Sequence, residues 1–145
     1  MILEKNKTRG DFLNNDKILK EKMMKSKKWA VVGVTKKKDR YGYKIWKILK
    51  EHEYTVYGVS PNYDELEGDK LYKSISDLPE KVDVVDMVVS PKIGIDLLDG
   101  IKEAGIGYVF FQPGTYNDEV IKKTEELGLE YLTDDCVYAT LRNEE

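Results

Sequence analysis

The sequence predicts a three-layer α/β protein whose centre is a doubly wound parallel sheet of about five strands. Short runs rich in β-branched and aromatic residues alternate along the chain with segments in which apolar residues recur at helical spacing. Strands that alternate with helices in this way pair in parallel and are joined by right-handed crossovers. Three of the expected strands also stop at a proline, Pro61, Pro91 or Pro113, which cannot extend a central ladder.

The elements can be placed from these patterns. We expect strands over residues 29–34, 54–59, 82–89, 108–111 and 129–132. We expect helices over residues 15–25, 41–51, from Ile93 to near Gly105, and from Asn117 or Asp118 to Leu127. The helix over 41–51 should bury Ile45, Ile48 and Leu49, which recur at helical spacing.

The rest of the chain is expected to be less regular. The polar segment 64–73 shows no strand pattern, and residues 75–78 form a short turn or helix that ends at Pro79. A flexible N-terminal tail over residues 1–14, a single domain over 15–138 and a C-terminal tail over 139–145 complete the prediction.

Composition and charge limit the classes of protein to which this chain is expected to belong. The 145 residues suffice for one domain, and the net charge is −3. Residues 1–28 hold nine Lys and Arg against four Asp and Glu, a net of +5, whereas residues 29–145 hold fifteen against twenty-three, a net of −8. Because the body is acidic, a nucleic-acid partner is not expected. The single cysteine excludes a disulfide framework. The sequence shows neither a signal-peptide core nor an apolar run long enough for a membrane, so we expect a cytoplasmic protein.

The loop after the first expected strand is a candidate phosphate site. It holds Gly33, Val34, Thr35, Lys36, Lys37, Lys38, Arg40, Tyr41 and Gly42. A glycine-bearing loop between a strand and a helix brings free N–H groups and the positive helix end to an anion. The spacing matches neither a G-x-G-x-x-G fingerprint nor a Walker A loop. Taken alone, the loop fits a phosphate site and a solvated basic loop equally well.

Other candidate residues follow the remaining strands, where ligands of such sheets bind. They are Ser60, Pro61 and Asn62, Ser90 and Pro91, then Gln112, Pro113 and Gly114, and finally Cys136 after two aspartates. NAD enzymes of this architecture place an acid after the second strand, for the ribose 2′-hydroxyl. Ser60 and Pro61 occupy that place, which disfavours NAD.

Neither catalytic nor metal-binding residues are predicted. The single histidine, His52, should lie at the far end of its helix from Cys136, so no nucleophile–base pair forms. Asp86 falls inside an apolar strand and should be a buried hydrogen-bonding group. Because His52 is not expected near it, we expect Cys136 to be structural or to line the ligand site. Tyr41, Tyr43, Tyr63 and Tyr116 could stack on an adenine, although surface packing is the default for tyrosine in this chain.

Five segments together carry a family resemblance: Ala30–Thr35 with its loop to Gly42, Val59–Tyr63, Val82–Asp86, Phe110–Gly114 and Asp134–Cys136. They resemble the small stand-alone CoA-binding domain proteins, which are similar to the nucleotide-binding domain of the succinyl-CoA ligase α-subunit. The resemblance covers about residues 14–138. The chain departs from the family pattern at Lys36–Lys38, where the family is often Ser- and Pro-rich, and at Asp135, where it commonly has Arg.

This resemblance implies a Rossmann-like fold that holds coenzyme A across the strand ends. Gly33, Thr35, Lys36 and the loop to Gly42 would meet the phosphates. Ser60 and Pro61 would border the adenosine, Ser90 and Pro91 would wall the cleft, and Gln112, Pro113 and Gly114 would lie near the pantetheine.

The leading hypothesis is therefore a module that binds coenzyme A or an acyl-CoA without evident catalytic machinery. An NAD(P)-binding oxidoreductase-like protein is one alternative. An interaction protein with a vestigial cleft is another, and a homodimer or an unidentified protein partner stays open.

Overall fold

The protein is built on one seven-stranded sheet, described here from a computed structural model. The model describes the backbone of residues 9–145 and the side chains of residues 15–145. The sheet order is β3-β4-β2-β1-β5-β6-β7. All neighbouring strands pair in parallel except β3 and β4, which are antiparallel. The predicted parallel α/β architecture is confirmed, with two strands more than expected.

The strands are short, with two to five residues each. They span Lys28–Val32 (β1), Thr55–Val59 (β2), Glu65–Leu66 (β3), Asp69–Tyr72 (β4), Val84–Met87 (β5), Tyr108–Phe111 (β6) and Glu130–Leu132 (β7). The chain crosses from one side of β1 to the other between β2 and β5. The carboxyl ends of β1 and β5 therefore flank the point at which the winding direction reverses.

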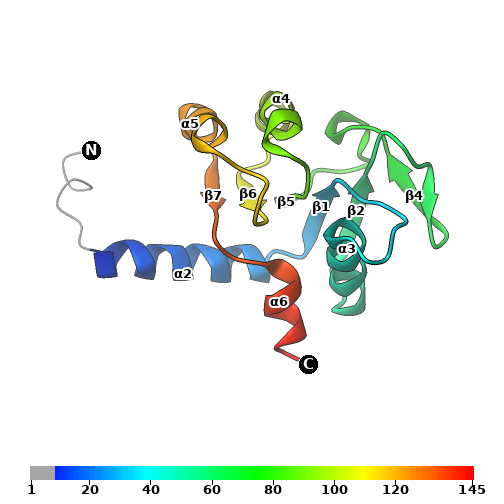
Figure 1. The fold of residues 1–145 in the computed structure, drawn as a ribbon, viewed down its shortest axis with the longest axis horizontal. Coiled ribbons are helices and arrows are strands. Elements are labelled where there is room, and N and C mark those ends of the chain that lie inside the picture. Colours follow the sequence, from blue (N-terminus) through cyan, green and yellow to red (C-terminus); the bar gives the residue numbers. More distant parts are fainter. Residues whose placement is uncertain (1–8) are drawn as a thin grey trace.

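Helices cover both faces of the sheet. They span Arg9–Lys25 (α2), Tyr41–Glu51 (α3), Pro91–Glu103 (α4), Asp118–Glu126 (α5) and Val137–Arg142 (α6), with a 3-10 turn η1 over Ile75–Asp77. Figure 1 shows α4 and α5 on one face of the sheet and α3 and α6 on the other. Helix α2 runs past β7 on the side of α3 and α6 and extends away from the sheet.

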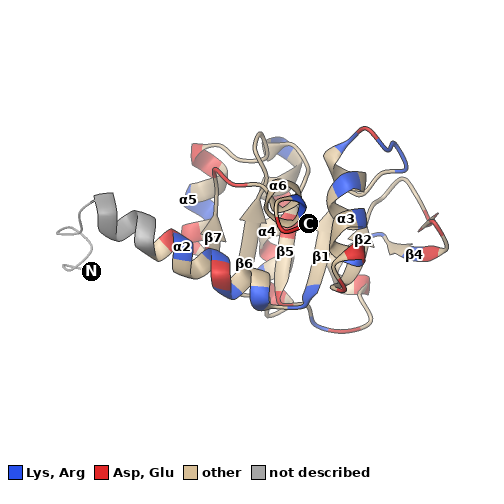
Figure 2. Ribbon diagram, turned by 90° about the horizontal axis from the view of Figure 1, so that it is seen from below, with Lys and Arg blue, Asp and Glu red and all other residues tan. Residues whose placement is uncertain are grey.

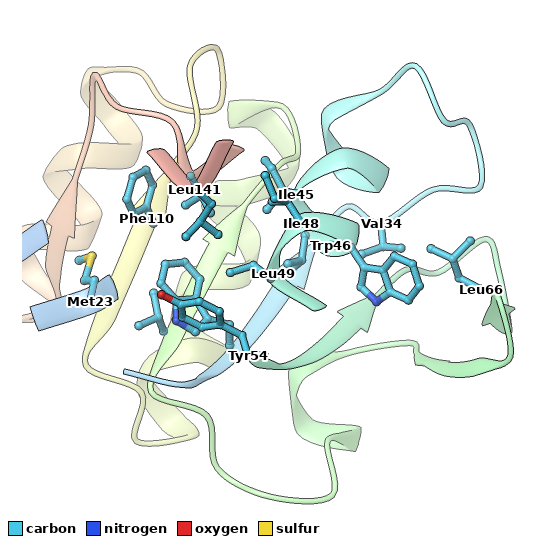
Figure 3. Packing of buried hydrophobic residues seen from close by; sticks show 14 of the residues in the cluster. Met23, Val34, Ile45, Trp46, Ile48, Leu49, Tyr54, Leu66, Phe110 and Leu141 are labelled. Carbon is cyan, nitrogen blue, oxygen red and sulfur yellow. The ribbon is translucent and has the colours of Figure 1, made fainter. Parts of the chain in front are cut away.

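Each face of the sheet carries its own apolar core. On the α3 side, Trp29, Val31 and Phe110 pack with the buried face of α3 and with Leu141 of α6 (Figure 3). The predicted buried residues of α3, Ile45, Ile48 and Leu49, are at most 3% exposed. On the α4 side, alternate strand residues pack with α4 and α5. A strand covered on both faces reads as a nearly continuous apolar run, and β1 and β5 have this pattern apart from Lys28 and Asp86.

Two regions differ from the prediction. Residues 64–73, expected to be a polar segment without strands, form the hairpin β3–β4, which turns at Glu67 and Gly68. Both turn residues have positive φ, 49° and 90°, which suits a two-residue hairpin loop. Residues 139–145, expected to be a tail, include most of α6. Leu141 of that helix is 1% exposed and belongs to the core.

Several boundaries also move. Helix α2 begins at Arg9 rather than residue 15, within the expected N-terminal tail, and residues 1–8 of that tail lie outside the described part. The first strand ends at Val32 because Gly33 has a φ of 106°, outside the extended region. The third expected strand is shorter than predicted and ends at Met87, so Val88 and Val89 lie beyond the ladder, at the strand ends.

Candidate functional site

Two glycines bring the start of α3 against the end of β1. The Gly33 N–H donates to the Val59 carbonyl at 3.0 Å, which fixes the loop beside β2. A Cβ added at Gly42 would lie 2.1 Å from the Gly33 carbonyl oxygen, and one added at Gly33 would lie 2.5 Å from the Val88 carbonyl oxygen. Only glycines permit this approach, so the first turn of α3 reaches the carboxyl ends of β1 and β5.

A first cavity of about 480 Å³ opens at the ends of β1 and β2. It is lined by the predicted residues Gly33, Val34, Thr35, Lys37, Ser60 and Pro61. Two lysines, Lys37 and Lys73, also lie on its wall, and no Asp or Glu is among the described residues that line it. Lys73 is held by Asp64, with 2.8 Å between Nζ and Oδ1. The cavity thus offers a positively charged wall to a ligand.

The three lysines of the loop have different surroundings. Lys36 Nζ forms an ion pair with Glu65 Oε1 of β3 at 2.8 Å, which lowers the pKa of that carboxyl. Lys38 Nζ lies 6.0 Å from the ring centre of Tyr43. Of the three, only Lys37 lines a cavity at the strand ends. Figure 2 shows this loop as a largely blue segment leading into α3.

A second cavity, of about 420 Å³, lies between the first turns of α3 and α6 and the loops after β5 and β6. Its lining includes the predicted residues Tyr41, Ser90, Gln112, Pro113, Gly114 and Cys136. Val88 and Val89 line both cavities, so the two meet at the end of β5. Most of the second wall is apolar, which suits an uncharged ligand segment.

Two helix N-termini face the junction of these cavities. Arg40 precedes α3 and Ser90 precedes α4, and neither side chain caps its helix with a hydrogen bond. The first N–H groups of both helices therefore lack the side-chain acceptor that Asn117 supplies to α5. Uncapped helix starts beside a lysine favour an anionic ligand group.

Some predicted site residues line neither cavity. They are Lys36, Lys38, Arg40, Gly42 and Pro91. Gly42 serves the site through its contact with Gly33, and Pro91 begins α4, where its fixed φ suits the first helical position. A separate hollow of about 570 Å³ lies between α2 and β7 and contains none of the predicted site residues.

Sequence reasoning missed part of the lining. Besides Val88 and Val89, the cavities are lined by Lys73, Ser74, Ile75, Thr115 and Ala139, among others. The β-branched run 82–89 predicts a strand through Val88 and Val89, because such a run carries no end signal of its own. Lys73 follows β4, and only recognition of that strand would have placed it at the sheet edge beside β2.

The predicted roles of the two unusual polar residues can be compared with their surroundings. Asp86 is fully buried, as predicted, and accepts a hydrogen bond of 2.6 Å from the Gln112 side chain. Burial raises the pKa of Asp86 to about 8, while the Gln112 bond acts in the opposite direction. Cys136 is partly exposed and lines the second cavity, and its N–H donates to Asp135 Oδ1.

The histidine and the possible metal ligands among the described residues do not gather at these cavities. His52 lies at the end of α3 away from them and contacts Glu145. Among the described side chains, no group of three His, Cys, Asp or Glu residues comes together as a metal site would require. Likewise, none of the helices in the described range 9–145 is both long and apolar enough to cross a membrane.

Comparison with known proteins decides the family. The model of the CoA binding domain family matches residues 27–142. The chain belongs to this CoA-binding domain family. The match includes every residue that lines the two cavities and ends with α6.

Relatives of two kinds share this domain. An ADP-forming acetate–CoA ligase of Methanocaldococcus jannaschii is 31% identical over 106 residues, which are 70% of this chain and 15% of the ligase. The chain thus spans under a sixth of that relative's length. An uncharacterized protein of Bacillus subtilis, YneT, is 25% identical over 119 residues, 82% of this chain and 88% of YneT.

Solved structures of small proteins share the whole fold. A hypothetical protein from Pyrococcus horikoshii superposes with a TM-score of 0.81 at 37% identity, over 88% of this chain and 90% of that one. A protein from Thermus thermophilus superposes with a TM-score of 0.80 at 28% identity, over 88% and 97% of the two chains.

Proposed function

We propose that this protein binds coenzyme A or an acyl-CoA across the carboxyl ends of β1, β2, β5 and β6. The family supports coenzyme A as the ligand class. The observation that carries the proposal for this chain is the pair of cavities that meet at Val88 and Val89, one with lysines on its wall and one largely apolar. A ligand with a charged nucleotide end and a long uncharged arm matches that division.

The nucleotide end belongs in the first cavity. Coenzyme A carries a pyrophosphate and a 3′-phosphate, and the cavity wall holds Lys37 and also Lys73, which is paired with Asp64. The start of α3, at the junction of the two cavities, adds N–H groups that would meet the pyrophosphate there. Ser60, Pro61 and Tyr63 would border the adenosine, since they line the side of the cavity next to β2.

The pantetheine arm would then cross Val88 and Val89 into the second cavity. Pro113, Ala139 and Tyr41 provide apolar contacts along that path. The Cys136 thiol lies on the same wall. In this arrangement Cys136 contacts the ligand and does not act as a nucleophile, so it needs no base. No histidine is among the described residues that line the second cavity.

An oxidoreductase that uses NAD receives less support, whereas the lysines would also suit the 2′-phosphate of NADP. An NAD site of this architecture uses an acid after the second strand to hold the ribose. The described lining of the first cavity contains lysines and no acid, and the neighbouring Asp64 and Glu65 are engaged with Lys73 and Lys36. A phosphorylated adenosine fits such a wall better than an unmodified ribose.

Isothermal titration with coenzyme A, dephospho-coenzyme A, NADPH and ADP tests the proposal. We expect saturable binding of coenzyme A, weaker binding of dephospho-coenzyme A, and about tenfold or greater loss in Lys37→Ala, since a charge-assisted hydrogen bond contributes about 1.5–3 kcal/mol. Lys122→Ala is the matched control, because Lys122 is an exposed lysine of α5 that lines neither cavity.

The outcomes separate the hypotheses. Equal loss of affinity in Lys37→Ala and Lys122→Ala would contradict the proposal that the phosphates bind in the first cavity. Binding of NADPH without coenzyme A would overturn the proposal in favour of the oxidoreductase alternative. Absence of binding to all four ligands would overturn it in favour of an interaction protein.

A further inference from the structure

Asp86 and Gln112 form an isolated polar pair inside an apolar core. Asp86 is 0% exposed and Gln112 is 3% exposed. They project from β5 and from the end of β6 toward α3 and α6, among Val31, Val84 and Phe110. Gln112 Nε2 donates to Asp86 Oδ1 at 2.6 Å. Among the described residues, none of opposite charge compensates the carboxyl, as burying an ionised group would require.

One atom of each group has no partner. Asp86 Oδ2 and Gln112 Oε1 are both buried acceptors that meet no hydrogen-bond donor among the described residues. Buried acceptors without partners are costly, and here two occur in the same bonded pair. A single proton on the carboxyl would satisfy both, because a neutral acid would donate from one oxygen to the amide oxygen while the amide donates to the other. The same two bonds form if the amide is turned by 180°.

The charged and titratable groups around the pair, among the described residues, do not donate to these atoms. The elements that cover the pair are α3 and α6, and their titratable or charged groups are Tyr41, Tyr43, Lys44, Lys47, Lys50, Glu51, Tyr138 and Arg142, with Cys136 just before α6. Lys44 Nζ lies 5.4 Å and 5.8 Å from the ring centres of Tyr41 and Tyr138, and Arg142 donates to the Tyr138 hydroxyl. Lys20 of α2 forms an ion pair with Asp135 at 2.8 Å. None of these groups shifts the pKa of Asp86, which is raised by burial.

We propose that Asp86 is a neutral acid at physiological pH and forms a two-hydrogen-bond acid–amide pair with Gln112 that holds the ligand-facing turn after β6 in place. Gln112 begins that turn, and its carbonyl accepts from the Thr115 N–H at 3.1 Å and from the Thr115 hydroxyl at 2.7 Å. The whole turn from Gln112 to Thr115 lines the second cavity. Asp86 is thus a positioning residue that acts on the ligand site through Gln112.

When Asp86 loses its proton to solvent, the acid–amide pair with Gln112 is lost. The ionised carboxylate retains one bond to the amide and leaves Gln112 Oε1 facing a negative oxygen. The amide then reorients, and the turn that it anchors loses its fixed position. The effect on ligand binding rests on the proposed function, whereas the protonation state can be tested without any ligand.

The first test uses Asp86→Asn, which presents the same donor and acceptor as the neutral acid at every pH. Asp83→Asn is the matched control, because it makes the same change at an exposed position of the same segment. We expect the unfolding constant of the wild type, measured in urea, to rise about tenfold per pH unit between pH 5 and 7 relative to Asp86→Asn. The Asp83→Asn variant should follow the wild type.

The second test reads the proton directly in the unaltered protein. Infrared spectroscopy at pH 6 should show the carbonyl band of a protonated carboxyl that disappears in alkali, and this measurement stands even if Asp86→Asn does not fold. Equal pH dependence of the wild type and Asp86→Asn, or no such band at pH 6, would overturn the proposal.

The third test concerns the ligand. The third measurement is the affinity for coenzyme A of the wild type and of Asp86→Asn, at pH 7 and at pH 9. At pH 9 the wild type should bind about tenfold more weakly than Asp86→Asn, because Asp86 must keep its proton for the ligand to bind. Ionisation of the coenzyme A thiol affects the wild type and the variant equally, so it cancels in the ratio of their affinities. An affinity ratio that does not change with pH overturns the positioning role. If neither protein binds coenzyme A, the proposed function fails, and the first two tests still decide the protonation state.

Discussion

Replacing Gly42 with Ala probes the contact on which the candidate site depends. Gly42 is the second residue of α3, and a Cβ there would lie 2.1 Å from the Gly33 carbonyl oxygen and 3.1 Å from its carbonyl carbon. Ordinary contact begins at 3.4 Å, so the two segments must separate by about 1.3 Å, the difference between 3.4 and 2.1 Å. Both partners are backbone, and no side-chain rotation can relieve the overlap.

The expected cost follows from two opposing effects. Overpacking of this kind costs about 1–3 kcal/mol, and we take about 3 kcal/mol because only backbone can move. Alanine in a helix is favoured over glycine by about 1 kcal/mol. The free energy of unfolding should therefore fall by about 2 kcal/mol, which lowers Tm by about 8 °C in a domain of this size.

Gly100→Ala is the matched control. Gly100 lies within α4, is exposed, and has no atom within 4 Å of an added Cβ. The same helix preference then acts alone, and Tm should rise by about 4 °C. Thermal unfolding followed by circular dichroism measures both variants. Titration with coenzyme A adds a functional readout, in which Gly42→Ala should bind at least about tenfold more weakly and Gly100→Ala like the wild type.

A Gly42→Ala variant that melts at or above the wild-type temperature would refute the reasoning, because the close approach of α3 to β1 would then not require glycine. Normal coenzyme A affinity in a destabilised Gly42→Ala variant would refute the link between this contact and the ligand site.

Three further predictions follow from other parts of the structure. Leu141→Ala should lower the free energy of unfolding by about 2–5 kcal/mol in urea titrations, because Leu141 is 1% exposed in the core, and an unchanged midpoint would mean that α6 is dispensable. Glu65→Gln removes the ion-pair partner of Lys36 and should strengthen coenzyme A binding at low salt, with Glu126→Gln on α5 as the control, and equal affinity in the two would contradict a role for Lys36. For Asp86, whose pKa is raised to about 8, the unfolded state binds fewer protons than the folded state between about pH 4 and 8. The wild-type free energy of unfolding should therefore fall with rising pH by about 1.4 kcal/mol per unit relative to Asp86→Asn, and a flat difference would contradict the raised pKa.

The sequence by itself determined the elements whose signals are local. Helix α3 has the bounds and the buried face that the spacing of Ile45, Ile48 and Leu49 indicates, because an amphipathic helix records its own orientation. The alternation of strands and helices predicted the parallel sheet and hence the edge at which polar loops gather. Asp86 was recognised as buried because its neighbours along the strand are apolar.

Features that depend on pairing between distant segments were decided only by the tertiary structure. The hairpin β3–β4 has no alternating apolar pattern, and β4 exists because it pairs with β2 and shields its edge. That hairpin supplies Glu65, which pairs with Lys36, so the lysines of one loop end in different surroundings although nothing in their sequence distinguishes them. Helix α6 is six residues long, too short to be stable alone, and depends on burying Leu141 against α3. The pairing of Asp86 with Gln112, 26 residues away, arises where two neighbouring strands end, because a sheet brings together residues that no local pattern connects.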